Sequence, residues 1–222
     1  MQQSPEFVLQ TIWKHDRFRS PQKAIIESVL DKNDVIALLP TGAGKSICYQ
    51  IPAIISEGIC LVISPLIALM NDQLNSLEKK GIKAMVLSSQ MSFQDTIRAF
   101  DNLKHGNYKL LYLSPEKLQS DIIQEKIKEL QLSFIAIDEA HCISEWGHDF
   151  RPSYLRLSLL KELFPSIPII ALTATATKEV VIDIEKQLKL KKPVIFKESH
   201  FRENLSLNVI YTEDIRAELL DI

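Results

Sequence analysis

The sequence predicts one α/β domain with a mainly parallel sheet and helices on both faces. Short runs of β-branched and apolar residues alternate with longer amphipathic stretches, which is typical of βαβ units. The chain has 222 residues, enough for one large domain. Its residues are 46% hydrophobic and 24% charged, so a packed core surrounded by a polar surface is expected.

The elements follow in order along the chain. The expected strands occupy residues 34–39, 59–64, 83–87, 109–113, 133–138 and 167–172. The expected helices occupy residues 22–30, 46–56, 67–80, 93–103, 121–130, 153–163 and 178–188. The alternation stops after residue 190, where residues 193–197 and 205–211 are expected to be short extended segments and residues 215–222 to begin a helix.

Composition argues against several classes of protein. No apolar run reaches the ~20 residues of a membrane helix, and the N-terminus lacks the pattern of a secretory leader. The three cysteines, Cys48, Cys60 and Cys142, lie far apart and indicate neither a disulfide framework nor a zinc site. We therefore expect an intracellular protein with no membrane partner. The net charge of −2 means that any nucleic-acid contact comes from a local site or from other parts of the protein.

A phosphate-binding loop is predicted between the first expected strand and the helix after it. Gly42 and Gly44 permit a turn whose N–H groups surround an anion at the start of that helix. Lys45 is expected to pair with the β- and γ-phosphates of ATP, and the Ser46 hydroxyl to bind Mg²⁺. The alternative is an ordinary glycine turn. The nucleotide-binding residues of this loop are Thr41, Gly42, Ala43, Gly44, Lys45 and Ser46.

A second catalytic element is predicted at the end of strand 133–138. Asp138 and Glu139 follow an apolar run, so both carboxylates are expected at the carboxyl edge of the sheet, where open α/β sheets bind ligands. Asp138 is placed to hold Mg²⁺, Glu139 to polarise the attacking water, and His141 to relay to the rest of the domain. The alternative is a helix start with acidic residues that suit its dipole.

The Asp-Glu-Ala-His sequence at 138–141, together with Thr173-Ala174-Thr175 after a later strand, resembles superfamily 2 helicases. The resemblance implies a RecA-like P-loop NTPase domain. In that group the Thr-Ala-Thr segment, here Thr173 and Thr175, couples ATP turnover to movement of nucleic acid. In that group the P-loop also lacks the first glycine of the strict pattern, and in this chain Leu39 stands at that position.

Further stretches narrow the resemblance to RecQ helicases. Residues 18–22, Phe-Arg-Ser-Pro-Gln, are similar to that family's adenine-recognition motif. By this resemblance the Gln22 amide contacts the adenine edge as donor and acceptor. Arg19 stacks on one face of the base and His15 is a candidate for the other face. The alternative is an ordinary helix start.

Residues 142–154 are similar to the aromatic-rich loop of RecQ enzymes. Aromatic faces stack on unpaired bases, and arginine pairs with phosphate or stacks, so this loop is the predicted DNA-binding and coupling site. The alternative is that the aromatic residues belong to the core. The candidate residues are Trp146, His148, Phe150, Arg151 and Tyr154.

Residues 64–73 resemble the family's motif Ia, in which Ser64 would contact the DNA backbone. Residues 112–118 occupy a similar turn from strand to helix. Both turns could equally be capped helix starts with proline near the first position.

The resemblance implies the ATP-binding motor domain of a 3′-to-5′ DNA helicase, with ATP and Mg²⁺ as cofactors and single-stranded or forked DNA as partner. Residues 1–200 are expected to form the first RecA-like domain and residues 201–222 to begin a linker to a second one, which supplies an arginine finger. The expected compartment is the bacterial cytoplasm or nucleoid, or the eukaryotic nucleus. An RNA-remodelling ATPase and a non-catalytic nucleic-acid-binding module remain the alternatives.

Overall fold

The computed structural model describes residues 3–88, 91–147 and 149–198. Every strand that the sequence predicted within these ranges is present, with ends shifted by one or two residues. The strands are β1 (Val35–Leu38), β2 (Ile59–Ile63), β3 (Ala84–Leu87), β4 (Leu110–Leu113), β5 (Leu132–Ile137), β6 (Ile169–Thr173) and β7 (Val194–Lys197). The predicted segments at 205–211 and 215–222, and the predicted linker 201–222, lie outside the described residues.

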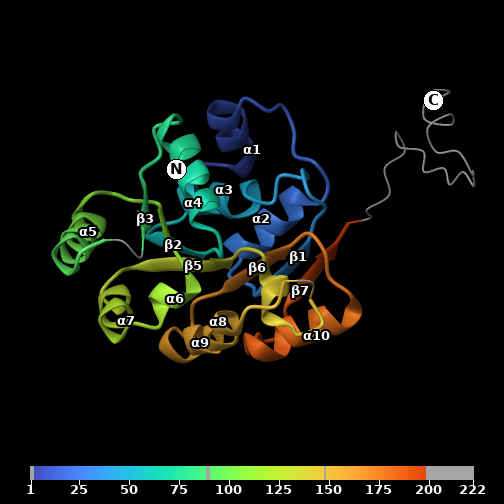
Figure 1. The fold of residues 1–222 in the computed structure, drawn as a ribbon. Helices are drawn as coiled ribbons and strands as arrows, with labels where there is room; N and C mark the ends of the chain where they lie inside the picture. The colour runs from blue at the N-terminus through green and yellow to red at the C-terminus, as the bar shows by residue number, and fades with distance from the viewer. Residues whose placement is uncertain (1–2, 89–90, 148, 199–222) are drawn as a thin grey trace, which may run out of the picture.

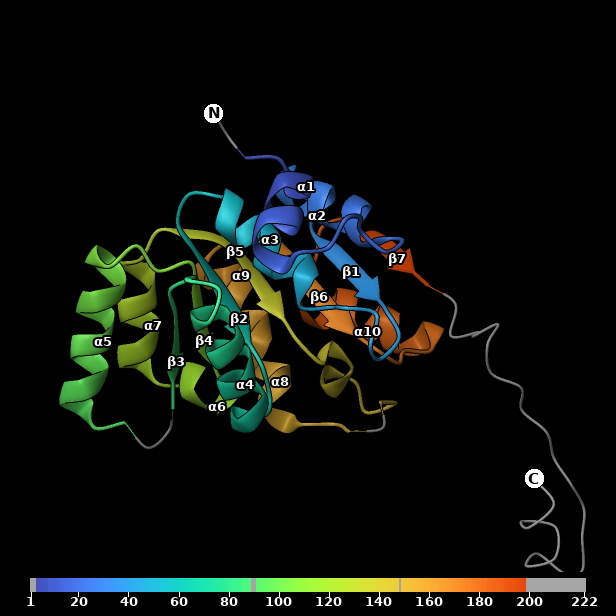
Figure 2. The same cartoon turned by 90° about the horizontal axis from the view of Figure 1, so that it is seen from above.

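The described strands form one sheet in the order β3-β4-β2-β5-β6-β1-β7 (Figure 1). Each adjacent pair runs parallel, with β3 at one end of the sheet and β7 at the other (Figure 2). The predicted α/β fold with a parallel sheet is therefore confirmed. The carboxyl ends of all these strands meet at a single edge.

Helices connect the strands. They are α1 (Pro5–Val8), α2 (Gln22–Leu30), α3 (Ile47–Ile55), α4 (Ile67–Glu78), α5 (Phe93–His105), α6 (Pro115–Leu118), α7 (Asp121–Lys128), α8 (Pro152–Leu155), α9 (Leu159–Leu163) and α10 (Lys178–Gln187). A π-helical turn η1 (Leu9–Trp13) and two 3₁₀ turns, η2 (Ala140–Ile143) and η3 (Arg156–Ser158), complete the described elements. Among the described residues, no helix is both long and apolar enough to cross a membrane.

One expectation about helices was wrong, and two helical elements were not expected. The single helix expected at 153–163 is divided into α8, η3 and α9. The Ser158 hydroxyl donates to the carbonyl oxygen of Leu155 at 3.4 Å, a local bond that competes with regular helix hydrogen bonding. The sequence also gave no expectation for α1 and η1, where Val8 and Leu9 are buried against α3.

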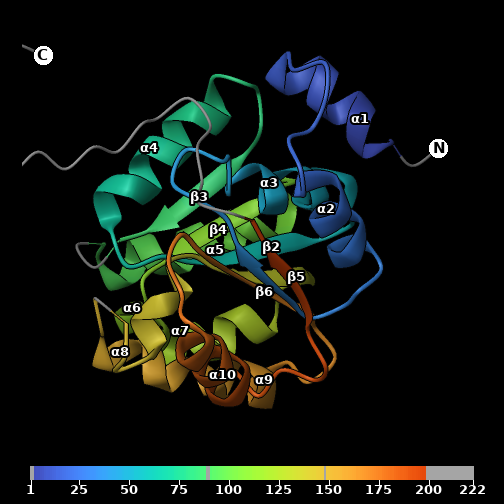
Figure 3. The same cartoon turned by 90° about the vertical axis from the view of Figure 1, so that its right-hand side faces the viewer.

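The sheet is covered on both faces, as predicted. Helices α2, α3 and α4 lie on one face and α6 to α10 on the other (Figure 3). Successive residues of β1 alternate between the two layers. Val35 and Ala37 pack with the α2–α4 layer, and Ile36 and Leu38 pack with the opposite one. Burial on both faces explains why the strands are continuous apolar runs.

A buried carboxylate ties the amino ends of β1, β6 and β7 together. Asp34 Oδ1 accepts from Lys161 Nζ at 2.8 Å and from the Ile169 N–H at 2.9 Å. Its Oδ2 accepts from the Lys191 N–H at 3.0 Å. The Lys161 and Asp34 side chains are only 10% and 6% exposed. Since removing one partner leaves the other charge buried and unpaired, this contact constrains the edge opposite the predicted site.

We expect Asp34→Ala to lower the free energy of unfolding by about 3–5 kcal/mol, because the Lys161 ammonium would stay buried without its carboxylate. Chemical denaturation gives this value. Asp31→Ala, at a nearby exposed position, is the control and should change stability by less than about 0.5 kcal/mol. A loss below about 1 kcal/mol for Asp34→Ala would contradict this role.

Candidate functional site

The predicted site residues meet at the carboxyl edge of three neighbouring strands. β6 lies between β1, which leads into the P-loop, and β5, which ends at Asp138. The Leu39 N–H donates to the Thr173 carbonyl oxygen at 3.0 Å, which joins the ends of β1 and β6. Lys45 lies close enough to Asp138 to oppose the rise in that carboxyl's pKa. The P-loop and the acidic pair therefore occupy one side of the molecule.

The P-loop adopts backbone conformations that favour glycine. Gly42 and Gly44 have φ angles of +81° and +77°, in the left-handed region that residues with a side chain rarely adopt. A Cβ atom on Gly44 would lie 2.6 Å from Gln22 Nε2. Gly44 is thus favoured by the turn, and a side chain there would make the end of the Gln22 side chain shift, whereas a Cβ on Gly42 would meet no atom of the described residues within 4 Å.

The two main adenine candidates contact the P-loop. Gln22 is buried, and its Nε2 donates to the carbonyl oxygens of Ala43 at 2.8 Å and Gly44 at 3.3 Å. Its Oε1 accepts from the Arg19 N–H at 3.0 Å, and Arg19 Nη1 donates to the Gly42 carbonyl oxygen at 2.9 Å. The amide therefore uses its donor and its acceptor to brace the loop in this structure.

The two carboxylates of the acidic pair, Asp138 and Glu139, lie close together, and Asp138 is partly buried. Burial, with the neighbouring Glu139 carboxylate, raises the pKa of Asp138 to about 6, against the opposing effects of Lys45 and His141. Glu139 has a φ of +48°, a conformation that costs energy for a residue with a side chain. A desolvated carboxylate with a raised pKa is a group that a cation stabilises, so Asp138, with the Ser46 hydroxyl, fits Mg²⁺.

A buried hydrogen-bond chain connects the acidic pair with the Thr-Ala-Thr segment. His141 Nδ1 lies 2.9 Å from Thr173 Oγ1 and 3.3 Å from Glu139 Oε2. The Thr173 hydroxyl donates to the Thr175 carbonyl oxygen at 3.1 Å and accepts from the Thr175 N–H at 3.3 Å. His141 Nδ1 thus lies within hydrogen-bonding distance of both the Thr173 hydroxyl and the Glu139 carboxylate. Movement of the segment therefore reaches Glu139 through His141.

The aromatic-rich loop divides into an exposed tip and anchored flanks. Trp146 is 76% exposed, the most exposed of the large apolar side chains among the described residues. Phe150 is half-buried. Arg151 pairs with Asp149 at 3.0 Å and donates to the Pro65 carbonyl oxygen at 3.2 Å, which ties the loop to the turn before α4. The predicted residue His148 lies outside the described residues.

Tyr154 does not occupy the place expected of a base-stacking residue. Its ring is fully buried in the core, and its hydroxyl donates to the main-chain carbonyl oxygen of Asp138 at 2.9 Å. The expectation of a stacking side chain at this position was wrong for this conformation. The α8 turn brings the ring back over the end of β5, so Tyr154 links the loop with the acidic pair instead.

Ser64 and His15 are the two remaining candidates, and the structure contradicts the expected role of Ser64 only. Ser64 is 2% exposed, and its hydroxyl has no hydrogen-bond partner among the described residues, so it cannot reach a phosphate without rearrangement. The residues exposed at that turn are Leu66 and Ile67. His15 is exposed after η1, and its main-chain N–H donates to the Leu9 carbonyl oxygen, so its stacking on adenine stays a prediction.

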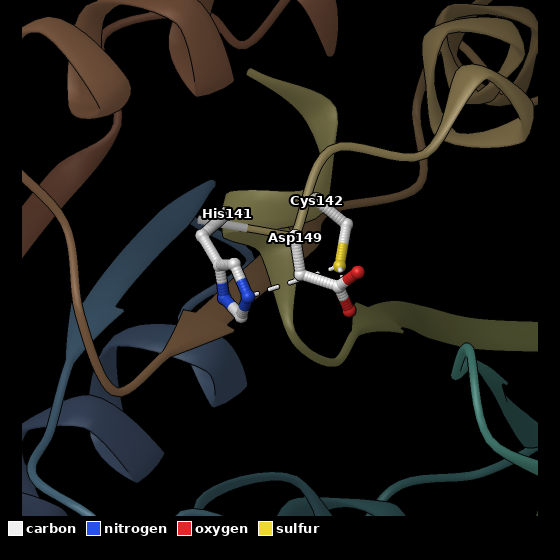
Figure 4. Close-up of side chains that lie close together, drawn as sticks. All are labelled: His141, Cys142 and Asp149. Atoms are coloured by element: carbon white, nitrogen blue, oxygen red, sulfur yellow. Dashed lines mark hydrogen bonds between the residues drawn. The ribbon is translucent and has the colours of Figure 1, made fainter. Parts of the chain in front are cut away.

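His141, Cys142 and Asp149 form a compact cluster with potential metal-ligand atoms within 4.8 Å of one another (Figure 4). Burial raises the pKa of the Cys142 thiol to about 12, and Arg151 lowers the pKa of Asp149. The thiol is therefore protonated at neutral pH, with Sγ 3.8 Å from Asp149 Oδ2. These charges favour a hydrogen-bonded link over a metal centre, since metals bind the thiolate.

Sequence reasoning missed the contacts that hold the loop in place. Ser144 bonds to Asp183 on α10, and a Cβ on Gly147 would lie 2.4 Å from the His141 carbonyl oxygen. Gly147 and Ser144 lie within the stretch that resembled the RecQ loop, so a structural requirement there could have been inferred. Asp183 lies in an ordinary amphipathic helix, and no pattern in the sequence distinguishes it.

The chain matches proteins of known families. The DEAD/DEAH box helicase family profile matches residues 19–184. ATP-dependent DNA helicase RecQ of Bacillus subtilis is 46% identical over 202 residues, which cover 90% of this chain and 34% of that protein. RecQ of Pasteurella multocida is 44% identical over 203 residues, covering 91% and 32%, respectively. The resemblance to RecQ helicases that the motifs indicated is confirmed, and the chain spans about a third of the length of these two relatives.

Solved structures share the fold. The helicase MrfA bound to DNA superposes with a TM-score of 0.68 at 19% identity, over 88% of this chain and 29% of that one. The Hef helicase domain of Pyrococcus furiosus superposes with a TM-score of 0.63 at 19% identity, over 81% and 38%. The RecA-like α/β fold is therefore confirmed.

We expect Gly44→Ala to weaken nucleotide binding, because the new methyl group would occupy the position of the Gln22 amide and make this side chain shift. Gly81→Ala is a matched control, because its φ of +73° carries the same strain, about 1–2 kcal/mol, but its Cβ would meet no atom of the described residues within 4 Å. Calorimetric titration of ATP into both variants tests this. Equal affinities would show that the approach of Gln22 is unimportant.

Proposed function

Because the chain belongs to the DEAD/DEAH box helicase family, we propose that it is the ATP-binding motor domain of a RecQ-like 3′-to-5′ DNA helicase. The observation that carries the proposal is the junction at the carboxyl edge of the sheet. There Lys45 lies close enough to Asp138 to oppose the rise in the pKa of that carboxyl, and Thr173 lies within hydrogen-bonding distance of His141, which follows the acidic pair. Such an enzyme acts where the genome lies, in the bacterial cytoplasm and nucleoid or the eukaryotic nucleus.

The P-loop side of the junction binds and orients ATP. Lys45 pairs with the β- and γ-phosphates, and the N–H groups of the loop wrap them at the start of α3. Ser46 and Asp138 would hold Mg²⁺, which when bound would neutralise the charge that develops on the phosphates. When adenine binds, the Gln22 amide and the Arg19 guanidinium leave the P-loop carbonyl oxygens and contact the base instead. Recognition of the base therefore removes hydrogen bonds that hold the P-loop in this structure.

The acidic side of the junction prepares hydrolysis. Glu139 accepts a hydrogen bond from the attacking water, and His141 holds that carboxylate through Nδ1. The Thr173 hydroxyl holds His141 in turn. A second RecA-like domain, to which residues 201–222 are expected to lead, would close the cleft and supply an arginine. Since such an arginine is worth about 10³–10⁵ in rate, the present domain alone hydrolyses ATP slowly.

The aromatic-rich loop couples DNA to this site. Trp146 presents a bare indole for stacking on an unpaired base of single-stranded or forked DNA. Arg151 connects the loop to the turn before α4, and Tyr154 connects it to the main chain of Asp138. A base that shifts the loop thereby shifts the acidic pair.

Two alternatives differ in measurable ways. An RNA-remodelling ATPase of the same superfamily would be stimulated by RNA at least as well as by DNA. The exposed indole, on a loop that Tyr154 anchors to Asp138, suits unpaired bases of RNA and of DNA alike. The RecQ relatives are named DNA helicases, which supports the DNA interpretation. A non-catalytic nucleic-acid-binding module would bind DNA without ATP turnover. The presence of Lys45, Asp138 and Glu139 together, with Lys45 close enough to Asp138 to affect the pKa of that carboxyl, argues against it.

In the full-length enzyme, we expect Lys45→Ala to reduce ATP turnover by about 10²-fold or more, because one preorganised charge at the phosphates is lost. Lys79→Ala, at an exposed position after α4, should keep wild-type turnover. A phosphate-release assay measures both. Turnover of Lys45→Ala within twofold of wild type would contradict the phosphate assignment.

We expect Trp146→Ala to leave ATP affinity intact and to remove most of the stimulation of ATP hydrolysis by single-stranded DNA. One stacked base is worth about 1–3 kcal/mol, so the DNA concentration for half-maximal stimulation should rise about tenfold or more. Phe93→Ala, which removes an aromatic ring that is 63% exposed at the start of α5, is the control. An unchanged response to DNA would remove Trp146 from the coupling site.

A further inference from the structure

The hydroxyl of Ser144 joins the aromatic-rich loop to α10. Ser144 follows η2 and is 1% exposed. Its Oγ donates to Asp183 Oδ2 at 2.5 Å and accepts from the Trp146 N–H at 3.2 Å. A distance of 2.5 Å is typical of a strong, charge-assisted bond between a hydroxyl and a carboxylate. The hydroxyl therefore uses its single hydrogen for α10 and a lone pair for the loop.

The carboxylate orients the hydroxyl. A serine hydroxyl rotates to suit its partners, so its lone pairs have a fixed direction only when its hydrogen is held. With the hydrogen held by Asp183, the lone pairs of Ser144 point toward the N–H of Trp146. A residue 39 positions away in the sequence thus sets the start of the turn that displays the indole.

The same turn is held tightly against η2. The Gly147 N–H donates to the Ser144 carbonyl oxygen at 2.9 Å, and Gly147 lies so close to His141 that no Cβ fits. The base of the turn is therefore fixed while the Trp146 side chain remains exposed. Movement of the indole is passed to Ser144 and its partners instead of being absorbed by a flexible loop.

We propose that Asp183 is a positioning residue for Trp146, and that the Ser144–Asp183 bond carries DNA occupancy from the loop to α10. This helix begins directly after the segment that contains Thr173 and Thr175. The bond forms a second connection to the ATP site, separate from the one that Tyr154 makes with Asp138. The inference rests on the proposed function, in which Trp146 contacts DNA.

The test uses the full-length enzyme and four variants. Asp183→Leu removes the acceptor, Asp183→Asn keeps an acceptor oxygen, and Ser144→Ala removes the hydroxyl with the loss of one atom. Glu185→Leu is the matched control, because it removes an acid from another face of α10. Two quantities are measured: the concentration of single-stranded DNA for half-maximal stimulation of the ATPase, and the ¹⁹F resonance of Trp146 in enzyme labelled with 6-fluorotryptophan. Loss of the peak in Trp146→Phe assigns that resonance.

We expect Asp183→Leu and Ser144→Ala to raise this DNA concentration about tenfold, and to shift or broaden the Trp146 resonance in the absence of DNA. Asp183→Asn should stay within about twofold of wild type, as should Glu185→Leu. A purely structural role would give equal defects in Asp183→Asn and Asp183→Leu or would leave the resonance unchanged, and either result would overturn the inference. Ser144→Ala provides the result if Asp183→Leu does not fold.

Comparison with Trp146→Ala separates the two levels of the proposal. If Trp146→Ala loses DNA stimulation while Asp183→Leu and Ser144→Ala behave as wild type, the positioning role fails and the proposed function stands. If Trp146→Ala itself responds normally to DNA, both fail together.

Discussion

The parallel alignment of β5, β6 and β1 is the constraint on which the rest of the site depends. Parallel strands end at the same edge, so the loop after β1, the threonines after β6 and the acids after β5 have to meet there. The middle position of β6 lets the Thr173 hydroxyl reach His141. At the opposite edge, the buried Asp34 carboxylate joins β1, β6 and β7, and so limits sliding of the strands that would misalign the site.

The sequence was sufficient to predict the strands and the two catalytic turns, because buried parallel strands require apolar runs and phosphate loops require glycine. It was insufficient for contacts that depend on how the chain returns to the sheet. Tyr154 lies in a polar stretch rich in aromatic residues, which indicates exposure. Its burial follows from the short α8 turn, whose position over β5 no local pattern encodes. Asp183 has the same limitation, since its role comes from the packing of α10 against η2.

The small negative net charge is consistent with a nucleic-acid site based on stacking. The guanidinium of Arg151 is already paired with Asp149 and bonded to the Pro65 carbonyl oxygen, so part of its charge is neutralised before any phosphate arrives. The indole of Trp146 is 76% exposed and gains by covering apolar surface when a base stacks on it. Contacts of this kind depend on unpaired bases more than on salt concentration, in contrast to a surface that tracks the backbone.

The hydroxyl of Tyr154 binds the main-chain oxygen of Asp138 and not its carboxylate. Protonation of the Asp138 carboxylate therefore does not remove the acceptor of this bond. The pKa of that carboxyl, about 6, lies near physiological pH. Only displacement of the strand end lengthens the Tyr154 hydrogen bond. The tyrosine hydroxyl is thus tied to the position of the strand end and makes no hydrogen bond to the carboxylate itself, so displacement of the loop and displacement of the strand end are linked through one main-chain hydrogen bond.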